Sequence, residues 1–293
     1  MGRYQRIGRL VSAALGCLGV LAVASEARAV QYGELHISAN TTLTDDRYGD
    51  IVFDADNVTL DCAGHQVHIS SYTKGQPGAG GAKVAIGAYG RNGITITNCR
   101  TVGGFDFSLF IKSSSNVTVR GVTGSTPARF DSNANTLVTG LNLSNAPIAL
   151  FIYNDFAGRY SASIACVTAG IFVDGSGLTA ISNTTVSGCQ NEAINASNNN
   201  HLLLDHVDTQ GNGNGLIVNN DDGDTIRSSV FSNNARYGMK IYDAGGPVGG
   251  GLTINNNKAL GNGTCDAYEL SSPWDTWSNN TFGTTCGTVP LFH

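Results

Sequence analysis

Five side chains between positions 112 and 174 could carry out acid–base chemistry on a sugar: Lys112, Arg129, Asp131, Tyr153 and Asp174. Asp131 and Asp174 could hydrolyse a glycosidic bond with inversion, which needs two carboxyl groups roughly 6.5–9.5 Å apart. Alternatively, Lys112 or Arg129 could neutralise a uronate carboxylate while Tyr153 removes the adjacent proton, which is β-elimination. A third interpretation is a solvated face without catalytic function. Both reactions require structural elements that bring distant residues onto one surface.

A repeat of 22 to 23 residues supplies such elements. Ile171–Asp174 returns as Ile194–Ser197 and again as Leu216–Asn219, and Cys166 and Cys189 are also 23 positions apart. A fixed period of this size is typical of a solenoid, in which each repeat stacks on its neighbours. Each short strand would pair with the equivalent strand one period later, which runs in the same direction. The repeat therefore predicts parallel sheets wound into a helix.

The composition agrees with many short strands joined by tight turns. Only 13% of the residues are charged and 38 of 293 are glycine, while Val, Ile, Leu and Thr recur at regular spacing. The net charge of -5 argues against a nucleic-acid partner, which would favour a basic face.

Residues 1–29 have the features of a secretory signal peptide. They contain a basic start at positions 3–9, an apolar run over 10–24 and a small-x-small cleavage site at 27–29. Lipidation at Cys17 is the alternative interpretation. Residues 30–293 should then form one solenoid domain that is secreted or periplasmic. They contain no second long apolar stretch, so we expect no membrane span.

Three segments carry a resemblance to a known family. Asp56–His65, Gly93–Cys99 and Asn116–Arg120 resemble the parallel β-helix repeats of the pectin-lyase-like superfamily. This resemblance implies an all-β fold, a single-stranded right-handed parallel β-helix of about ten coils. The superfamily contains lyases, hydrolases, epimerases, esterases and proteins with no known reaction, so it does not define an activity. The Asp-Pro-His-Asp motif of the alginate epimerases is absent from the sequence.

The repeat sorts the first strand of each coil into an inner and an outer face. The inner positions are all apolar, as a buried face requires: Leu109, Ile111, Ala128, Phe130, Leu150, Ile152, Ile171, Val173, Ile194, Ala196, Leu216, Val218, Met239 and Ile241. The outer positions are Phe110, Lys112, Arg129, Asp131, Phe151, Tyr153, Phe172, Asp174, Asn195, Ser197, Ile217, Asn219, Lys240 and Tyr242.

The outer positions are rich in aromatic and charged side chains, and in the β-helix enzymes that the chain resembles this sheet carries the substrate cleft. Aromatic rings pack on sugar rings, and charged groups bind hydroxyls or carboxylates. We therefore expect Phe110, Phe151, Phe172, Lys240 and Tyr242 to bind substrate. The alternative is that the loop at 71–81 or a partner chain covers the rings.

The six cysteines that follow the signal peptide permit three disulfides, although sequence alone allows 15 connectivities. The period favours Cys166–Cys189, because residues one repeat apart lie on adjacent coils about 4.8 Å apart. Cys265–Cys286 fits the same argument. Cys62–Cys99 fits it once a loop at about 71–84 is set aside. Buried thiols stacked in a ladder are the alternative, and no cysteine spacing suggests a zinc site.

Two further segments could hold a metal ion. Asn219–Asp224 is an oxygen-rich turn that could bind Ca²⁺, but an ordinary Asp/Gly turn also explains it. His201 and His206 flank Asp205 and are expected at turn edges rather than in a metal site. We expect no other cofactor.

The sequence thus predicts a secreted protein that binds an extracellular, acidic polysaccharide, with cleavage as a lyase or glycoside hydrolase left open. The alternative is a non-catalytic surface, scaffold or glycan-binding protein.

Overall fold

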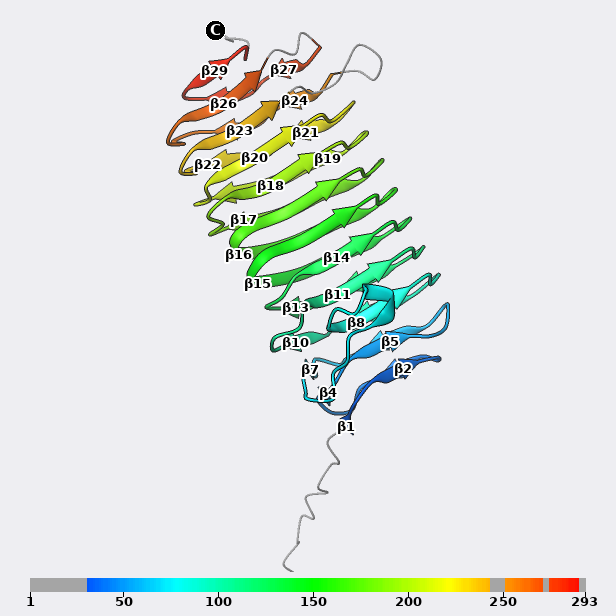
Figure 1. Ribbon diagram of the computed structural model, residues 1–293. Helices are drawn as coiled ribbons and strands as arrows, with labels where there is room; N and C mark the ends of the chain where they lie inside the picture. Colours follow the sequence, from blue (N-terminus) through cyan, green and yellow to red (C-terminus); the bar gives the residue numbers. More distant parts are fainter. Residues whose placement is uncertain (1–30, 243–250, 271–273, 290–293) are drawn as a thin grey trace, which may run out of the picture.

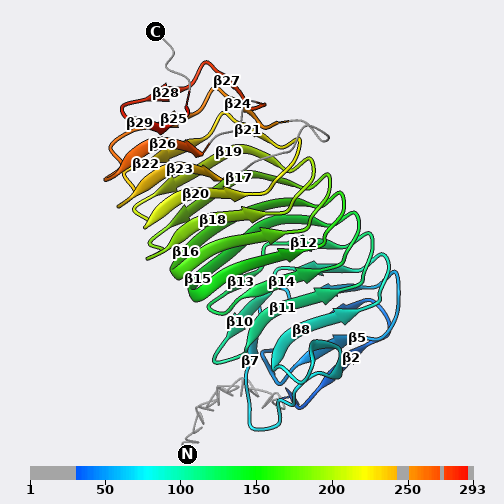
Figure 2. The same ribbon diagram turned by 45° about the horizontal axis from the view of Figure 1, so that its top comes forward.

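The computed structural model describes residues 31–242, 251–270 and 274–289. They form a right-handed parallel β-solenoid of about eleven coils (Figure 1), close to the ten predicted. Every strand pairing is parallel and joins strands one coil apart, and the three sheets run along the solenoid axis (Figure 2). The expected signal peptide at 1–29 lies outside the described residues. No helix among the described residues is long and apolar enough to cross a membrane.

The first sheet contains the strands whose faces the sequence analysis assigned. It consists of β2 (Leu35–Ile37), β5 (Ile51–Phe53), β8 (Val84–Tyr89), β11 (Phe107–Lys112), β14 (Ala128–Asp131), the last parts of β15 (Leu137–Tyr153) and β16 (Arg159–Asp174), β18 (Glu192–Ser197), β20 (Asn214–Asn219), β23 (Tyr237–Tyr242), β26 (Cys265–Leu270) and β29 (Thr285–Gly287).

The second and third sheets complete each coil. The second sheet consists of β3 (Thr41–Thr42), β6 (Thr59–Asp61), β9 (Thr95–Thr97), β12 (Thr118–Arg120), the first parts of β15, β16, β17 (Ala180–Ser187) and β19 (Leu203–Gln210), then β21 (Thr225–Arg227), β24 (Thr253–Asn255) and β27 (Thr276–Ser278). The third sheet consists of β1 (Gln31–Tyr32), β4 (Arg47–Tyr48), β7 (Gln66–His68), β10 (Arg100–Val102), β13 (Thr123–Gly124), later parts of β15, β16, β17 and β19, then β22 (Val230–Ser232), β25 (Lys258–Ala259) and β28 (Thr281–Phe282).

The predicted inner and outer faces of the first sheet are confirmed. The register places Leu109 beside Ala128, Ala128 beside Leu150, and Leu150 beside Ile171. All inner positions named from the sequence are buried in one continuous core. Each large apolar side chain buried in this way contributes about 1.5–3 kcal/mol, so the stacked core supplies most of the stability.

Asparagine forms the corners between the first and second sheets. Asn116 and Asn135 have φ of 52° and 55°, a left-handed conformation that Asn adopts more readily than other non-glycine residues. Their side chains also form a ladder, because Asn116 Nδ2 donates to Asn92 Oδ1 at 2.8 Å and Asn135 Nδ2 donates to Asn116 Oδ1 at 3.3 Å. The asparagine-rich turns therefore both bend the coil and join it to the next.

All three predicted disulfides are present: Cys62–Cys99, Cys166–Cys189 and Cys265–Cys286. In the first two pairs the Cα atoms are 4.8 and 4.9 Å apart, the spacing of adjacent coils. The loop that lengthens the Cys62–Cys99 separation contains a short 3₁₀ helix, η1 (Pro77–Ala79).

That loop covers the N-terminal end of the first sheet's outer face. Gln76 Oε1 accepts a hydrogen bond from Tyr89 Oη at 2.6 Å, and Gln76 Nε2 donates to Asp50 Oδ2 at 3.2 Å. Gly78 lies against the Tyr89 ring so closely that a Cβ there would overlap it. The loop thus covers β8 and leaves the later strands of the sheet for other contacts.

Candidate functional site

The five acid–base candidates lie together on the outer face of the first sheet, over β11, β14, β15 and β16. The register pairs Lys112 with Asp131, Asp131 with Tyr153, and Tyr153 with Asp174 on successive strands. Arg129 lies on the neighbouring column of the same face. The backbones of Asp131 and Asp174 are two strand spacings apart, or about 9.6 Å.

Arg129 is the centre of this cluster. Its Cζ lies 5.1 Å from the centroid of the Phe110 ring and 4.8 Å from that of Tyr153, so the guanidinium contacts rings on both flanking coils. Its Nη2 also forms an ion pair with Asp131 Oδ2 at 2.8 Å, and Asp131 Oδ1 accepts from Ser132 Oγ at 2.8 Å. Arg129 thus joins β11, β14 and β15, with its charge already balanced by Asp131.

The exposed part of the cluster is aromatic. Phe151 and Tyr153 stack with ring centroids 5.7 Å apart, and the Tyr153 and Phe172 centroids are 5.6 Å apart. All three rings are half-buried, so their edges are fixed while part of each face remains in solvent. We call these three residues the aromatic strip.

Phe110 faces outward as predicted, but it is only 4% exposed. The rings of Phe107 and Tyr89 contact it at centroid distances of 5.2 and 5.9 Å, and Arg129 covers it from the other side. Its ring therefore supports Arg129 rather than offering a surface to a ligand.

The surroundings of Tyr153 bear on its suitability as a base. Burial raises the pKa of its phenol, Asp174 and Asp131 raise it further, and Arg129 partly opposes them. A phenol with a raised pKa keeps its proton at neutral pH, so Tyr153 is better suited to donate a proton than to remove one.

Asp174 has protein partners too. Its Oδ1 accepts a hydrogen bond from Asn198 Nδ2 at 2.9 Å, and Asn220 Nδ2 donates to Asn198 Oδ1 at 2.9 Å. Asp174 thus begins an amide ladder at the corner after the first sheet. A general acid would instead need a carboxyl proton directed at the leaving oxygen of the sugar.

Lys240, predicted as a ligand-binding residue, is surrounded by aromatic rings. Its Nζ lies 4.4, 4.5 and 5.4 Å from the ring centroids of Tyr237, Tyr242 and Tyr268. Tyr242 was predicted for this surface, and Tyr237 and Tyr268 were not. Tyr268 pairs with Lys240 across a coil of 28 positions, so the period of 22 to 23 could not locate it.

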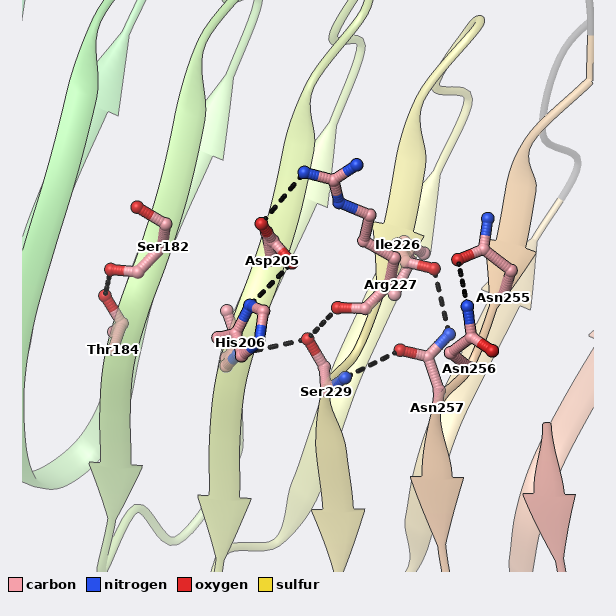
Figure 3. Close-up of polar contacts among 11 residues, drawn as sticks. Ser182, Thr184, Asp205, His206, Ile226, Arg227, Ser229, Asn255, Asn256 and Asn257 are labelled. Atoms are coloured by element: carbon pink, nitrogen blue, oxygen red, sulfur yellow. Dashed lines mark hydrogen bonds and ion pairs between the residues drawn. The ribbon is translucent and has the colours of Figure 1, made fainter. Parts of the chain in front are cut away.

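The histidines of the second sheet lie at turn edges, as expected. His201 and His206 have φ of 60° and 54°. His206 Nδ1 contacts Asp205 Oδ1 at 2.8 Å, and Arg227 Nη2 forms an ion pair with Asp205 Oδ2 at 3.0 Å (Figure 3). Burial raises the pKa of Asp205, but Arg227 and His206 outweigh it and hold that pKa below its ordinary value. The described residues contain no cluster of three or more metal-ligating side chains.

The turn that suggested Ca²⁺ directs two of its carboxylates into the core. Asp221 Oδ1 accepts from the Asn199 amide at 2.8 Å, and Asp224 Oδ1 accepts from the Leu202 amide at 2.7 Å. Burial, together with Asp221, raises the pKa of Asp224 to about 9. These contacts suit a structural turn, and Ca²⁺ binding stays a prediction.

Two hollows lie on the third sheet, where no site was predicted. The larger has a volume of about 440 Å³ and is lined by Arg100, Thr101, Val102, Thr123, Gly124, Ser125, Asn142 and Ser144. The second, of about 290 Å³, shares Asn142 and continues over Gly140, Leu141, Ser161, Ala162, Ser163, Asn183 and Thr185. The outer side chains of this sheet are mostly hydroxyls and amides, which gave no distinctive signal in the sequence.

Comparison with known proteins supports the fold. A family model described as a right-handed beta helix region matches residues 129–282. A search of curated proteins finds no match. The A-module of a mannuronan C-5 epimerase from Azotobacter vinelandii is similar in structure, with a TM-score of 0.55, 12% identity, and 89% of this chain and 86% of that chain covered. A surface protein and adhesin of Streptococcus pneumoniae has a TM-score of 0.51 and 8% identity, with 88% of each chain covered.

Proposed function

Because the chain belongs to the family of right-handed β-helix proteins, we propose that it is an extracellular polysaccharide-binding protein. The ligand lies along the outer face of the first sheet, from β11 to β26, and is acidic. Two proteins of similar fold, a mannuronan C-5 epimerase module and a surface adhesin, are compatible with this assignment.

The observation that carries the proposal is the aromatic strip held in place by Arg129. A sugar ring needs a rigid, partly exposed aromatic face, since ordering a mobile ring would cost binding free energy. Phe151, Tyr153 and Phe172 provide such faces, and the contact of Arg129 with Tyr153 fixes the middle ring. Phe151 and Tyr153 lie side by side on β15 and Phe172 lies one coil further along, so the strip spans two adjacent coils and suits contact with one or two sugar units of a longer chain.

The preference for an acidic chain rests on two lysines. Neither Lys112 nor Lys240 has an acidic side chain within ion-pair distance among the described residues, whereas Arg129 is paired with Asp131. The two lysines lie on strands six spacings apart, or about 29 Å, with the aromatic strip between them. A polymer that carries carboxylates at intervals could reach both.

Cleavage is the second candidate function. For β-elimination, Lys112 is the cation available to a uronate carboxylate, and Tyr153, two strands along the same column, is the proton-transfer group. For hydrolysis, Asp131 and Asp174 start from backbones about 9.6 Å apart, and their side chains would have to lean toward each other to bring the carboxyl groups within roughly 6.5–9.5 Å. However, the raised pKa of Tyr153 and the protein hydrogen bonds of both carboxylates favour binding without turnover.

A glycan array of the mature protein, followed by calorimetry on the best acidic oligosaccharide, tests the binding proposal. The Phe151→Ala, Phe172→Ala double variant should bind about five- to a hundredfold more weakly, at roughly 0.5–1.5 kcal/mol for each lost aromatic contact. Phe156→Ala is the matched control, because Phe156 is 54% exposed but lies at the corner beyond the first sheet. Equal affinity of the double variant and the wild type would refute the assignment.

Absorbance of unsaturated uronates and reducing-end assays separate binding from cleavage. Turnover that disappears in Asp131→Asn and Asp174→Asn while binding persists would identify a hydrolase. Turnover that disappears in Lys112→Ala and Tyr153→Phe, with an unsaturated product, would identify a lyase.

A further inference from the structure

One coil of the solenoid is shorter than its neighbours, and this shortening creates the larger hollow. Between the paired residues Leu109 and Ala128 the coil advances 19 positions, against 23 for the preceding coil and 22 for the following one. The missing residues lie at the corner between the third and first sheets. From Thr123 to Ala128 there are five positions, but the equivalent segments are nine residues long before it and eight after it.

The floor of the hollow is a buried hydroxyl network. Thr101 Oγ1 donates to Ser108 Oγ at 2.8 Å, and Ser108 Oγ donates to the Thr126 carbonyl at 2.9 Å. Gly124 lies directly over these hydroxyls, and a Cβ there would overlap both. The hydroxyl groups of the floor are thus hydrogen-bonded within the protein, so the floor is rigid. Only the side chains of the walls are available to bind a ligand.

The walls carry polar groups that the protein does not use. The side chains of Arg100, Ser125, Asn142 and Ser144 make no hydrogen bond or ion pair with any of the described residues, and Arg100, Ser125 and Asn142 are exposed. They supply donors and acceptors around a volume of about 440 Å³, with one positive charge at one wall. Val102 provides an apolar contact on the same side.

The two hollows form one groove along the axis. Asn142 lines both, and the register continues from Arg100 through Thr123, Asn142 and Ser163 to Thr185. Four strand spacings correspond to about 19 Å. In Figure 1, β10 and β13 lie at the side of the solenoid next to β11 and β14, so the groove is on a different sheet from the aromatic strip.

The geometry points to a second glycan-binding site in this groove, for a short oligosaccharide whose carboxylated unit lies at Arg100. A protein partner would favour aromatic anchors, and the groove has none. A nucleic acid would need more than one cation. A saccharide matches alternating hydroxyl and amide groups, and Arg100 can bind a carboxylate with two parallel hydrogen bonds. This site does not depend on the strip for its function.

The test uses the Phe151→Ala, Phe172→Ala protein as background, so that binding at the strip is weakened. Oligogalacturonates and oligomannuronates, with their carboxyl-reduced counterparts, are the probes. Asn142→Trp fills both hollows from an exposed position, and Ser187→Trp is the control, on an exposed position of the same sheet outside both hollows. Thermal melts of each variant verify folding.

Asn142→Trp should weaken the remaining binding by about tenfold or more, whereas Ser187→Trp should not. Arg100→Ala should weaken oligouronate binding by about ten- to a hundredfold and leave the carboxyl-reduced probe unchanged. Equal weakening of both probes would overturn the carboxylate assignment. Unchanged affinity in Asn142→Trp, or no binding of any probe at millimolar concentration, would overturn the site. The strip proposal would survive either result, because its test uses the wild-type groove.

Discussion

Replacing Arg129 by methionine tests whether the guanidinium stabilises the outer face as the structure indicates. Methionine keeps much of the side-chain volume but removes the contacts with the Phe110 and Tyr153 rings and the ion pair with Asp131. The Arg129 side chain is 33% exposed, so solvent weakens each interaction. We assign about 0.5–1 kcal/mol to each cation–π contact and about 0.5–1 kcal/mol to the ion pair. The expected loss is about 2 kcal/mol.

Urea unfolding is the appropriate assay, because guanidinium salts would screen the ion pair. Asp131→Asn should cost about 1 kcal/mol, since it removes the charge and keeps a hydrogen-bond acceptor. The double variant should cost less than the sum of the two, because both substitutions remove the same ion pair. Arg120→Met is the control, on an exposed arginine of β12 with no ion pair among the described residues. A loss in Arg129→Met within about 0.5 kcal/mol of that control would show that the cluster contributes no stability.

Three further predictions concern the core and its pH dependence. Val218→Asp should unfold the central coils in thermal melts, because an unpaired buried charge costs several kcal/mol or more. The control Asn219→Asp, on the outer face, should change the melting temperature little. Burial raises the pKa of Asp155 to about 7 and, with Asp221, that of Asp224 to about 9. The folded state therefore binds more protons than the unfolded state, and the melting temperature should fall as pH rises from about 4 to 9. Asp224→Asn should flatten this dependence of the melting temperature on pH. A melting temperature that rises over this range would contradict the assignment. Gly124→Ala should lower stability by about 1–3 kcal/mol in urea, because its Cβ overlaps the hydroxyl network below it, and an unchanged midpoint would show that the network can move aside.

The sequence predicts which side chains of the first sheet face the core and which face outward, because a solenoid is nearly one-dimensional. Residues one period apart must stack, so the apolar column through Leu150, Ile171 and Ile194 followed from the spacing. The spacing also favoured stacking of Cys166 on Cys189, and the structure shows that the two are bonded. The same argument predicts Asp131 beside Tyr153, and the register confirms it.

The sequence by itself determined the period, the parallel pairing, the buried columns and the cysteine pairs, since each depends on a repeat that is local along the chain. Only the tertiary structure decided which outward residues are exposed. Phe110 is covered because Tyr89, Phe107 and Arg129 converge on it. Tyr268 lies beside Lys240 across a coil of 28 positions, longer than the repeat in the sequence. The groove on the third sheet lies where one coil has a shorter corner than the coils on either side. This difference in corner length leaves a hollow only when the longer neighbouring coils are stacked on both sides.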